Sequence, residues 1–124
     1  MQLRALSTRP FIGARDFELS SDFYAAMGFD VQLIEPGFAV CTNQKVQFYL
    51  QDYYVKDWID NTMLFIEVED VDQCYHQLAA LGLPDRFKGA RLSPVKIDTW
   101  GKECFLHDPS GILWHFGAFN RTEV

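Results

Sequence analysis

The chain has 124 residues, the length of one ordinary domain, and is 48% hydrophobic, 15% aromatic and 23% charged. This composition is that of a globular protein and excludes a disordered or collagen-like chain. The net charge of −6 and the pI near 4.9 argue against nucleic-acid binding, which requires lysine and arginine to neutralise phosphates. Such a charge favours a cationic small ligand, although it also serves solubility alone.

Neither a membrane span nor a secretory leader is expected. Apolar runs such as Met63 to Ile66 are far shorter than the roughly 20 residues that cross a bilayer, and the N-terminal segment lacks the apolar core of a signal peptide. Cys41, Cys74 and Cys104 are odd in number and widely spaced, which predicts buried neutral thiols rather than disulfides or a thiolate zinc site. We therefore expect a cytoplasmic protein with no membrane partner.

The first half of the chain is predicted to form a strand at 10–14, a helix between Asp16 and Gly28, and strands at 31–34, 38–42 and 45–51. A linker at 52–61 follows. The second half is predicted to form a strand at 63–68, a helix between Asp70 and Gly82, a loop at 84–94, and strands at 96–99, 103–107 and 113–119. In each helix, Asp can cap the start and Gly can adopt the left-handed conformation that ends it.

Segments 14–29 and 68–83 align without a gap at a constant offset of 54, so that Asp16 matches Asp70 and Gly28 matches Gly82. Internal duplication explains this match. We therefore expect a single domain, 1–124, made of two pseudo-repeats at about 8–51 and 62–120.

Four motifs cover nearly the whole chain: RDFELSSDFYAAMGF at 15–29, DNT at 60–62, IEVEDVDQCYHQLAALGL at 66–83 and WGKECFLHDPSGILWHFG at 100–117. Together they resemble the glyoxalase / bleomycin-resistance / extradiol-dioxygenase (vicinal oxygen chelate) superfamily, and the DNT motif looks like its bleomycin-binding branch. The resemblance implies an α+β fold of two tandem βαβββ modules whose sheets curl into a cup-shaped half-barrel around the site.

Many enzymes of that superfamily hold a divalent metal in the cup, and the resemblance identifies the positions of the ligands. Arg9 and Met63 occupy the first-strand positions, where neither side chain suits such an ion, because Arg has no lone pair to donate and a thioether is a soft ligand. Only His115 remains at the last strand. No metal, cofactor or catalytic residue is therefore predicted, although a rearranged site of Glu103, His107 and His115 stays open as the basis of a metal-dependent glyoxalase-, transferase- or dioxygenase-like enzyme.

The resemblance implies a metal-free binding protein that sequesters a planar cationic antibiotic, such as a bleomycin-like compound, in an aromatic and acidic cleft at a homodimer interface. The predicted ligand-binding residues are Phe38, Tyr49, Asp60, Asn61, Phe65, Trp100, Gly101, Gly111 and His115. Binding of an unrelated endogenous metabolite is a further alternative, because a fold does not fix its ligand.

Plainer interpretations stand beside these assignments. Phe38 and Phe65 lie in strand patterns and are explained by core packing, and Trp100 by an interface. The segment 60–62 is explained by a turn. The aromatic residues of the linker either cap the core or line the rim of a binding cleft. In the last strand, alternation places Trp114 and Phe116 toward the helices, which leaves His115 facing the cup.

Overall fold

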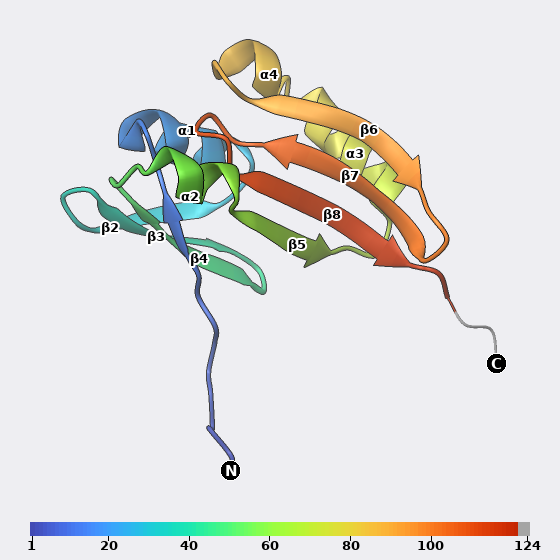
Figure 1. Ribbon diagram of the computed structural model, residues 1–124, viewed down its shortest axis with the longest axis horizontal. Coiled ribbons are helices and arrows are strands. Elements are labelled where there is room, and N and C mark those ends of the chain that lie inside the picture. The colour runs from blue at the N-terminus through green and yellow to red at the C-terminus, as the bar shows by residue number, and fades with distance from the viewer. Residues whose placement is uncertain (122–124) are drawn as a thin grey trace.

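Each half of the chain folds into a strand, a helix and three further strands, as the duplication predicts. A computed structural model describes residues 1–121 and places the two modules beside one another (Figure 1). The first module contains β1 (Phe11–Gly13), α1 (Phe17–Ala26), β2 (Asp30–Glu35), β3 (Phe38–Asn43) and β4 (Val46–Gln51). The second contains β5 (Met63–Glu67), α3 (Val71–Ala80), α4 (Leu83–Arg86), β6 (Arg91–Ile97), β7 (Gly101–His107) and β8 (Leu113–Phe119), and α2 (Lys56–Asp60) lies between the modules in sequence.

The two sheets have the same topology. The first sheet has the strand order β1-β4-β3-β2 and the second has β5-β8-β7-β6. In each, the first strand of the module runs parallel to the last, and the other pairs are antiparallel. These mixed sheets do not close into a barrel, and they confirm the predicted α+β fold of two βαβββ modules. No helix within residues 1–121 is long and apolar enough to cross a bilayer.

The predicted helix signals are confirmed. The Asp16 carboxylate accepts a hydrogen bond from the backbone N–H of Leu19 at 3.0 Å, and Asp70 accepts the equivalent bond from Gln73 at 3.0 Å. Gly28 and Gly82 have φ angles of 101° and 62°. Such capping satisfies N–H groups that have no partner inside the helix.

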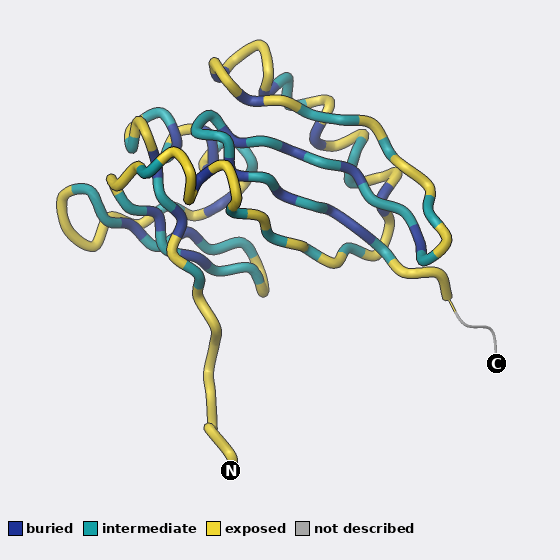
Figure 2. Tube along the Cα trace, in the orientation of Figure 1, coloured by how far each residue is buried: buried dark blue, intermediate teal, exposed yellow. Residues whose placement is uncertain are grey.

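One face of each sheet packs against its own helix and forms the core. Phe48 and Leu50 alternate with Gln47, Tyr49 and Gln51 along β4, so that the first pair is buried and the other three are partly exposed. The second sheet shows the same alternation in β7 and β8, where buried and partly exposed segments follow one another (Figure 2). The opposite face of each sheet points away from its helix and is called the cup side below. These cup sides therefore carry the candidate functional side chains.

Two segments differ from the sequence-based prediction. The linker contains α2, whose Ile59 is buried in the core, whereas Tyr53 and Trp58 are more than half exposed. The aromatic residues therefore do not cap the core, and that interpretation was wrong. The predicted loop at 84–94 contains α4 and the start of β6. Pro94 is tolerated in β6 because β6 is an edge strand and has a bulge between Ser93 and Lys96.

A buried polar network joins the two modules. The Tyr24 hydroxyl on α1 donates to Asp108 Oδ2 at 2.6 Å and accepts from Trp114 Nε1 at 3.0 Å. Asp108 Oδ1 accepts three backbone N–H bonds at 2.9 Å from its own turn, 110–112. Ser110 in turn accepts from the backbone N–H of Arg15 at 2.9 Å. The motif HDPSG thus anchors the β7–β8 turn against the first module.

Burial sets the ionisation of the core. It raises the pKa of the Asp108 carboxyl, and it raises the pKa of Tyr24 well above 10.0, with the neighbouring Asp108 as the second cause. All three cysteines are free thiols. Cys41 and Cys104 are buried as predicted, and burial raises the pKa of each to about 12, whereas Cys74 is only partly buried.

Candidate functional site

The first aromatic face lies on the helix-distant side of the first sheet and consists of Phe11, Phe38 and Tyr49. The rings of Phe38 and Tyr49 stack with centroids 5.1 Å apart, and those of Phe11 and Tyr49 lie 5.0 Å apart. Arg9 already occupies this face. Its guanidinium lies 5.6 Å from the Tyr49 ring centroid and donates to the Tyr49 hydroxyl at 3.1 Å. The face is therefore shaped to hold a cation against an aromatic ring.

The second aromatic face lies on the second sheet and consists of Phe65, Trp100 and Phe119. Its ring centroids are 5.3 Å apart for Trp100 and Phe119, 5.8 Å for Phe65 and Phe119, and 6.1 Å for Phe65 and Trp100. A Cβ added at Gly117 would lie 2.5 Å from the Phe65 ring. Because Gly117 has no side chain, the Phe65 ring can lie across β8 at this position.

His115 lies beside the second aromatic face, as the alternation of β8 predicts. Trp114 and Phe116, its neighbours in sequence, are buried in the core. The Nδ1 atom of His115 makes a 2.7 Å hydrogen bond with the carboxylate of Glu103. The ring of Phe105 lies edge-on at 5.0 Å between centroids.

The other predicted residues, apart from Gly101, lie at a third place, around the end of α2. Asp60 forms an exposed ion pair with Lys56, and the side chain of Asn61 donates to the backbone carbonyl of Asp57 at 2.6 Å. Gly111 has a φ of 109°, and a Cβ added to it would lie 3.6 Å from Asp60. These contacts are those of a helix end and a tight turn.

Gly101 begins β7, next to Trp100, where the backbone of β8 approaches it closely. A Cβ added at Gly101 would lie 2.0 Å from the carbonyl oxygen of Ala118. This position requires a residue without a side chain. Gly101 therefore lets β7 and β8 approach each other at the edge of the second aromatic face, next to Trp100.

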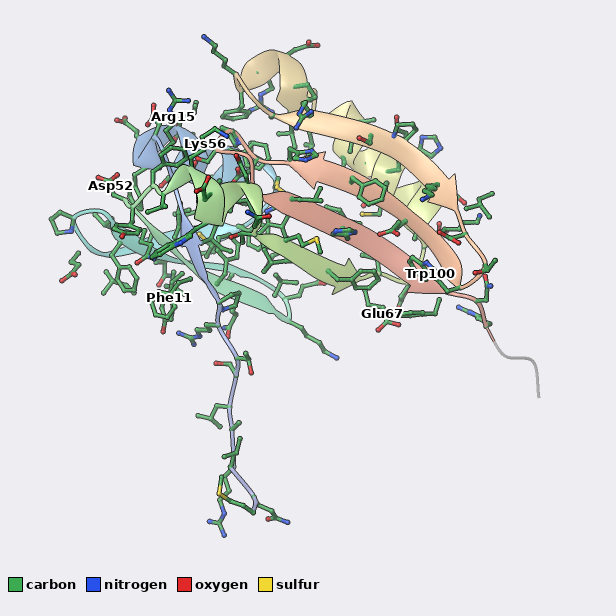
Figure 3. The ribbon with its side chains drawn as sticks, in the orientation of Figure 1. Phe11, Arg15, Asp52, Lys56, Glu67 and Trp100 are labelled. Carbon is green, nitrogen blue, oxygen red and sulfur yellow. The ribbon has the colours of Figure 1, made fainter. Side chains whose placement is uncertain are left out.

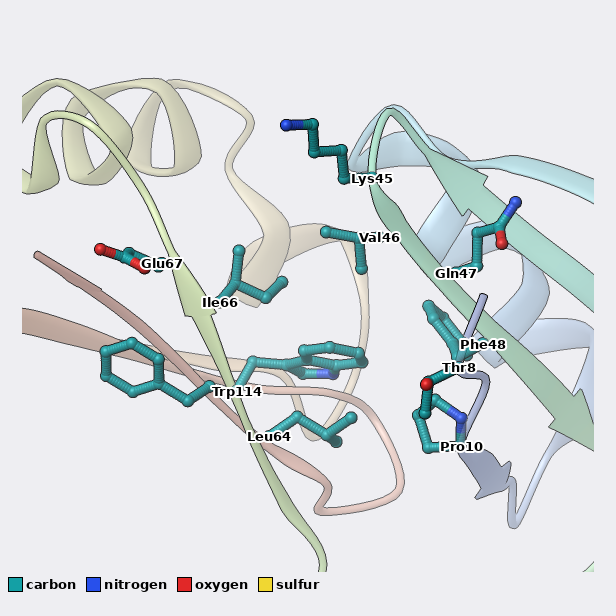
Figure 4. A pocket seen from close by; sticks show the side chains of 11 residues that line it. Thr8, Pro10, Lys45, Val46, Gln47, Phe48, Leu64, Ile66, Glu67 and Trp114 are labelled. Atoms are coloured by element: carbon teal, nitrogen blue, oxygen red, sulfur yellow. The ribbon is translucent and has the colours of Figure 1, made fainter. Parts of the chain in front are cut away.

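A cavity of about 330 Å³ lies where the two modules meet (Figure 4). Its lining comes from the N-terminal segment, the turn before β4, and strands β4, β5 and β8: Thr8, Pro10, Lys45, Val46, Gln47, Phe48, Leu64, Phe65, Ile66, Glu67 and Trp114. Phe65 is the predicted site residue that reaches it. Phe11 and Trp100 mark the two aromatic faces on separate modules (Figure 3).

The residues present do not fit the metal that the superfamily implies. The Arg9 guanidinium is hydrogen-bonded to Tyr49 and Gln47 at its position, and Met63 is an exposed thioether. Within residues 1–121 no three His, Cys, Asp or Glu side chains are grouped to hold a metal ion.

The alternative site of Glu103, His107 and His115 fails for a geometric reason. Glu103 and His107 are four residues apart on β7, a separation of about 13 Å along a strand. Phe105 lies between them on the same face and is the register partner of His115. His115 therefore reaches Glu103 without bringing His107 to the same point.

Sequence reasoning missed Phe11, Phe119, Gly117 and Phe105. Two signals in the chain identify Phe11, Gly117 and Phe119. The repeat offset of 54 carries Phe65 onto Phe11, and the alternation in β8 that places His115 on the cup side also places Gly117 and Phe119 there.

Solved structures with the same fold include three antibiotic-related proteins. The bleomycin-binding protein of the bleomycin producer Streptomyces verticillus, solved with copper(II)-bleomycin, is 24% identical, with a TM-score of 0.79 over 96% of this chain and 100% of that one. The bleomycin resistance determinant encoded on transposon Tn5 is 17% identical, with a TM-score of 0.78 over 94% and 100%. An antibiotic-binding protein from Streptomyces sp. CB03234 is 20% identical, with a TM-score of 0.70 over 96% and 100%.

A glyoxalase/bleomycin resistance protein/dioxygenase from Nocardioides has the same fold at 19% identity, with a TM-score of 0.73 over 98% of this chain and 89% of that one. No family model matches the sequence, and no curated protein matches it. The chain therefore has the fold of the glyoxalase / bleomycin-resistance / dioxygenase superfamily, which the sequence motifs predicted.

Proposed function

We propose that this protein binds a planar, cationic small molecule in the cytoplasm without transforming it, and that it does so as a homodimer. The observation that carries the proposal is the pair of aromatic faces, one on each sheet of the same chain. Aromatic rings stack on planar heterocycles and attract cations, with each contact contributing about 0.5–2 kcal/mol.

Exposure of these rings supports a dimer. Phe11, Phe65 and Phe119 are 59%, 44% and 57% exposed in the single chain, and clustered exposed aromatic side chains mark interaction surfaces. We propose that each cleft combines the first aromatic face of one chain with the second aromatic face of the other. A two-fold dimer then forms two equivalent clefts.

Charge supports a cationic ligand. Glu67 lies two residues from Phe65 on β5, and Glu103 lies two residues from Phe105 on β7. Because side chains two residues apart on a strand point to the same face, both carboxylates share the face of the aromatic rings. The chain as a whole carries a net charge of −6. An acidic surface attracts cations before contact.

We propose that the ligand is an antibiotic of the bleomycin type, which the fold neighbours that bind bleomycin support. Phe38, Tyr49, Phe65, Trp100 and His115 would contact it, and Asp60, Asn61, Gly101 and Gly111 would shape the rim of the cleft. Sequestration of such a compound would confer resistance to it.

Fluorescence titration with metal-free bleomycin tests the proposal. Trp100 lies in the second aromatic face, so we expect quenching in the wild type and its loss in Trp100→Phe, whereas Trp58→Phe keeps it. Sedimentation should show a dimer. A monomer, or an unchanged spectrum up to high micromolar bleomycin, would contradict the proposal, as would a stoichiometric metal ion retained through purification.

A further inference from the structure

Glu103 and His115 form the closest polar contact on the cup side of the second sheet. Their 2.7 Å contact is shielded from water, since the two side chains are only 13% and 20% exposed. Shielded charge-assisted hydrogen bonds are stronger and better ordered than surface pairs. The pair is therefore a fixed part of the surface that, under the proposed function, meets the ligand.

The strand register explains how Glu103 reaches the imidazole. His115 is the register partner of Phe105, and Glu103 is the partner of Gly117. Because Gly117 adds no side chain opposite Glu103, the carboxylate is free to extend diagonally along the strands to His115. The Phe105 and Phe65 rings flank the imidazole, at 5.0 and 6.3 Å between centroids.

In the neutral form of His115, this contact fixes which nitrogen carries the proton. An ionised carboxylate can only accept a hydrogen bond, so Nδ1 of His115 must donate to Glu103. The neutral imidazole then presents Nε2 as an acceptor. With Nδ1 bonded and the ring flanked by two aromatic side chains, Nε2 is the polar atom that remains for a ligand.

We propose that Glu103 is a positioning and specificity-determining residue, which holds the His115 imidazole so that Nε2 selects cations that carry an N–H donor. The inference rests on the proposed function and narrows its ligand class. A planar cation whose nitrogen is fully alkylated would stack on the same rings but make no hydrogen bond to Nε2.

Two planar cations distinguish stacking on the rings from hydrogen bonding to Nε2. Protonated aminoacridine carries N–H donors, whereas N-methylacridinium has the same ring system and charge but no N–H. We expect the wild type to bind aminoacridine about tenfold more tightly, the effect of one hydrogen bond to a charged group. Glu103→Leu should lose this preference, and Glu103→Gln, whose amide oxygen still accepts from Nδ1, should restore part of it.

Glu67→Gln is the matched control, because it removes the same charge from the same face at a carboxylate that is not the partner of His115 Nδ1. It should weaken both cations alike and keep the preference. Nitrogen-15 NMR of the imidazole gives a readout independent of affinity. At mildly alkaline pH the wild type should carry its proton on Nδ1, and Glu103→Leu should lose that fixed form.

The outcomes separate the two proposals. Equal binding of both cations by the wild type, or loss of the preference in Glu67→Gln, overturns the role of Glu103 and leaves cation binding intact. An unchanged imidazole spectrum in Glu103→Leu also overturns it. Binding of neither cation overturns the proposed function itself.

Discussion

The two modules place their first and last strands in the same register, so each half of the cup surface has a counterpart in the other. Phe11 faces Tyr49 across β1 and β4, and Phe65 faces His115 across β5 and β8. Beside Tyr49 lies an aromatic ring, Phe38, whereas His115 is bonded to a carboxylate. At this last-strand position the duplication has kept the place and changed the chemistry, with ring stacking at Tyr49 and a hydrogen bond to a carboxylate at His115.

The last hairpins of the two modules also differ. In the first module a short turn at Gln44, with a φ of 53°, joins β3 to β4. In the second, the longer turn at 108–112 reaches α1 of the other module through Asp108 and Tyr24. The turn of the second hairpin therefore holds the pair of modules together by buried hydrogen bonds.

Asp108→Ala should have the largest effect of the changes considered, because it removes the acceptor for Tyr24 and for three backbone N–H groups at once. Each buried donor left without a partner costs about 1–3 kcal/mol. We expect the free energy of unfolding in urea to fall by about 3–5 kcal/mol. Asp98→Ala, which removes an exposed turn bond to Thr99, is the control and should cost below about 1 kcal/mol. Similar losses in both variants would contradict a special role for this turn.

Tyr24→Phe tests the other side of the module junction. At neutral pH it leaves Asp108 Oδ2 and Trp114 Nε1 without a partner, and we expect a loss of about 1.5–3 kcal/mol. Its pH dependence is more specific. Because burial raises the pKa of folded Tyr24 well above 10.0, the unfolded chain releases that proton first, and stability falls as the pH rises above about 10.

Burial also raises the pKa of Cys41 and Cys104, so these thiols too make the folded state less stable as the pH rises. The contribution of Tyr24 is therefore measured as the difference in the free energy of unfolding in urea between the variant and the wild type. Tyr24→Phe should show a shallower loss of stability at alkaline pH. Tyr53→Phe, at a half-exposed tyrosine, should follow the wild type. A Tyr24→Phe curve parallel to the wild type would show that Tyr24 does not titrate this way.

The topology of both modules could be predicted from the sequence because it is encoded locally and twice. Asp16 and Asp70 are caps that act within one helical turn, and the repeat offset confirms each of the two long helices by its copy. The first part of β6 was predicted as loop, because Pro94 normally ends a strand. Its tolerance depends on the edge position and the bulge, which only the folded sheet determines.

The candidate site was less predictable. Alternation along β8 was sufficient to place His115 on the cup side. The bond from His115 to Glu103 depends on the register between β7 and β8, which no local pattern specifies. The contact of Asp108 with Tyr24 could not be predicted either, because it joins residues that are 84 positions apart.

Gly117→Ala tests why the second module can carry an aromatic ring across its last strand. The added Cβ would lie 2.5 Å from the Phe65 ring, so the ring must move. Overpacking of this kind costs about 1–3 kcal/mol, and we expect the lower part of that range because Phe65 is partly exposed. Aminoacridine binding should weaken several-fold in a fluorescence titration.

Gln51 is the register counterpart of Gly117 in the first module, and Gln51→Ala is the matched control. It shortens a side chain and forces no ring to move, so stability should change by less than about 0.5 kcal/mol. Unchanged stability and affinity in Gly117→Ala would show that the Phe65 ring has room elsewhere.

The smallest expected effect concerns Arg9, the cation that occupies the first aromatic face. Arg9 lies over Tyr49 and bonds to its hydroxyl, so a ligand cation must replace it there. An exposed cation–π contact is worth about 0.5–1 kcal/mol. Arg9→Ala should therefore tighten aminoacridine binding by about two- to fivefold while changing stability by less than about 0.5 kcal/mol.

Arg4→Ala is the control, since Arg4 is an exposed cation of the same N-terminal segment. It removes the same charge without freeing the Tyr49 ring. A gain in aminoacridine affinity from general electrostatics should therefore appear in both variants, whereas a gain from the freed ring should appear only in Arg9→Ala. If Arg9→Ala weakens binding instead, the guanidinium contacts the ligand directly. The first module would then contribute a hydrogen-bonding group of its own, and the contrast between stacking at Tyr49 and hydrogen bonding at His115 would not hold.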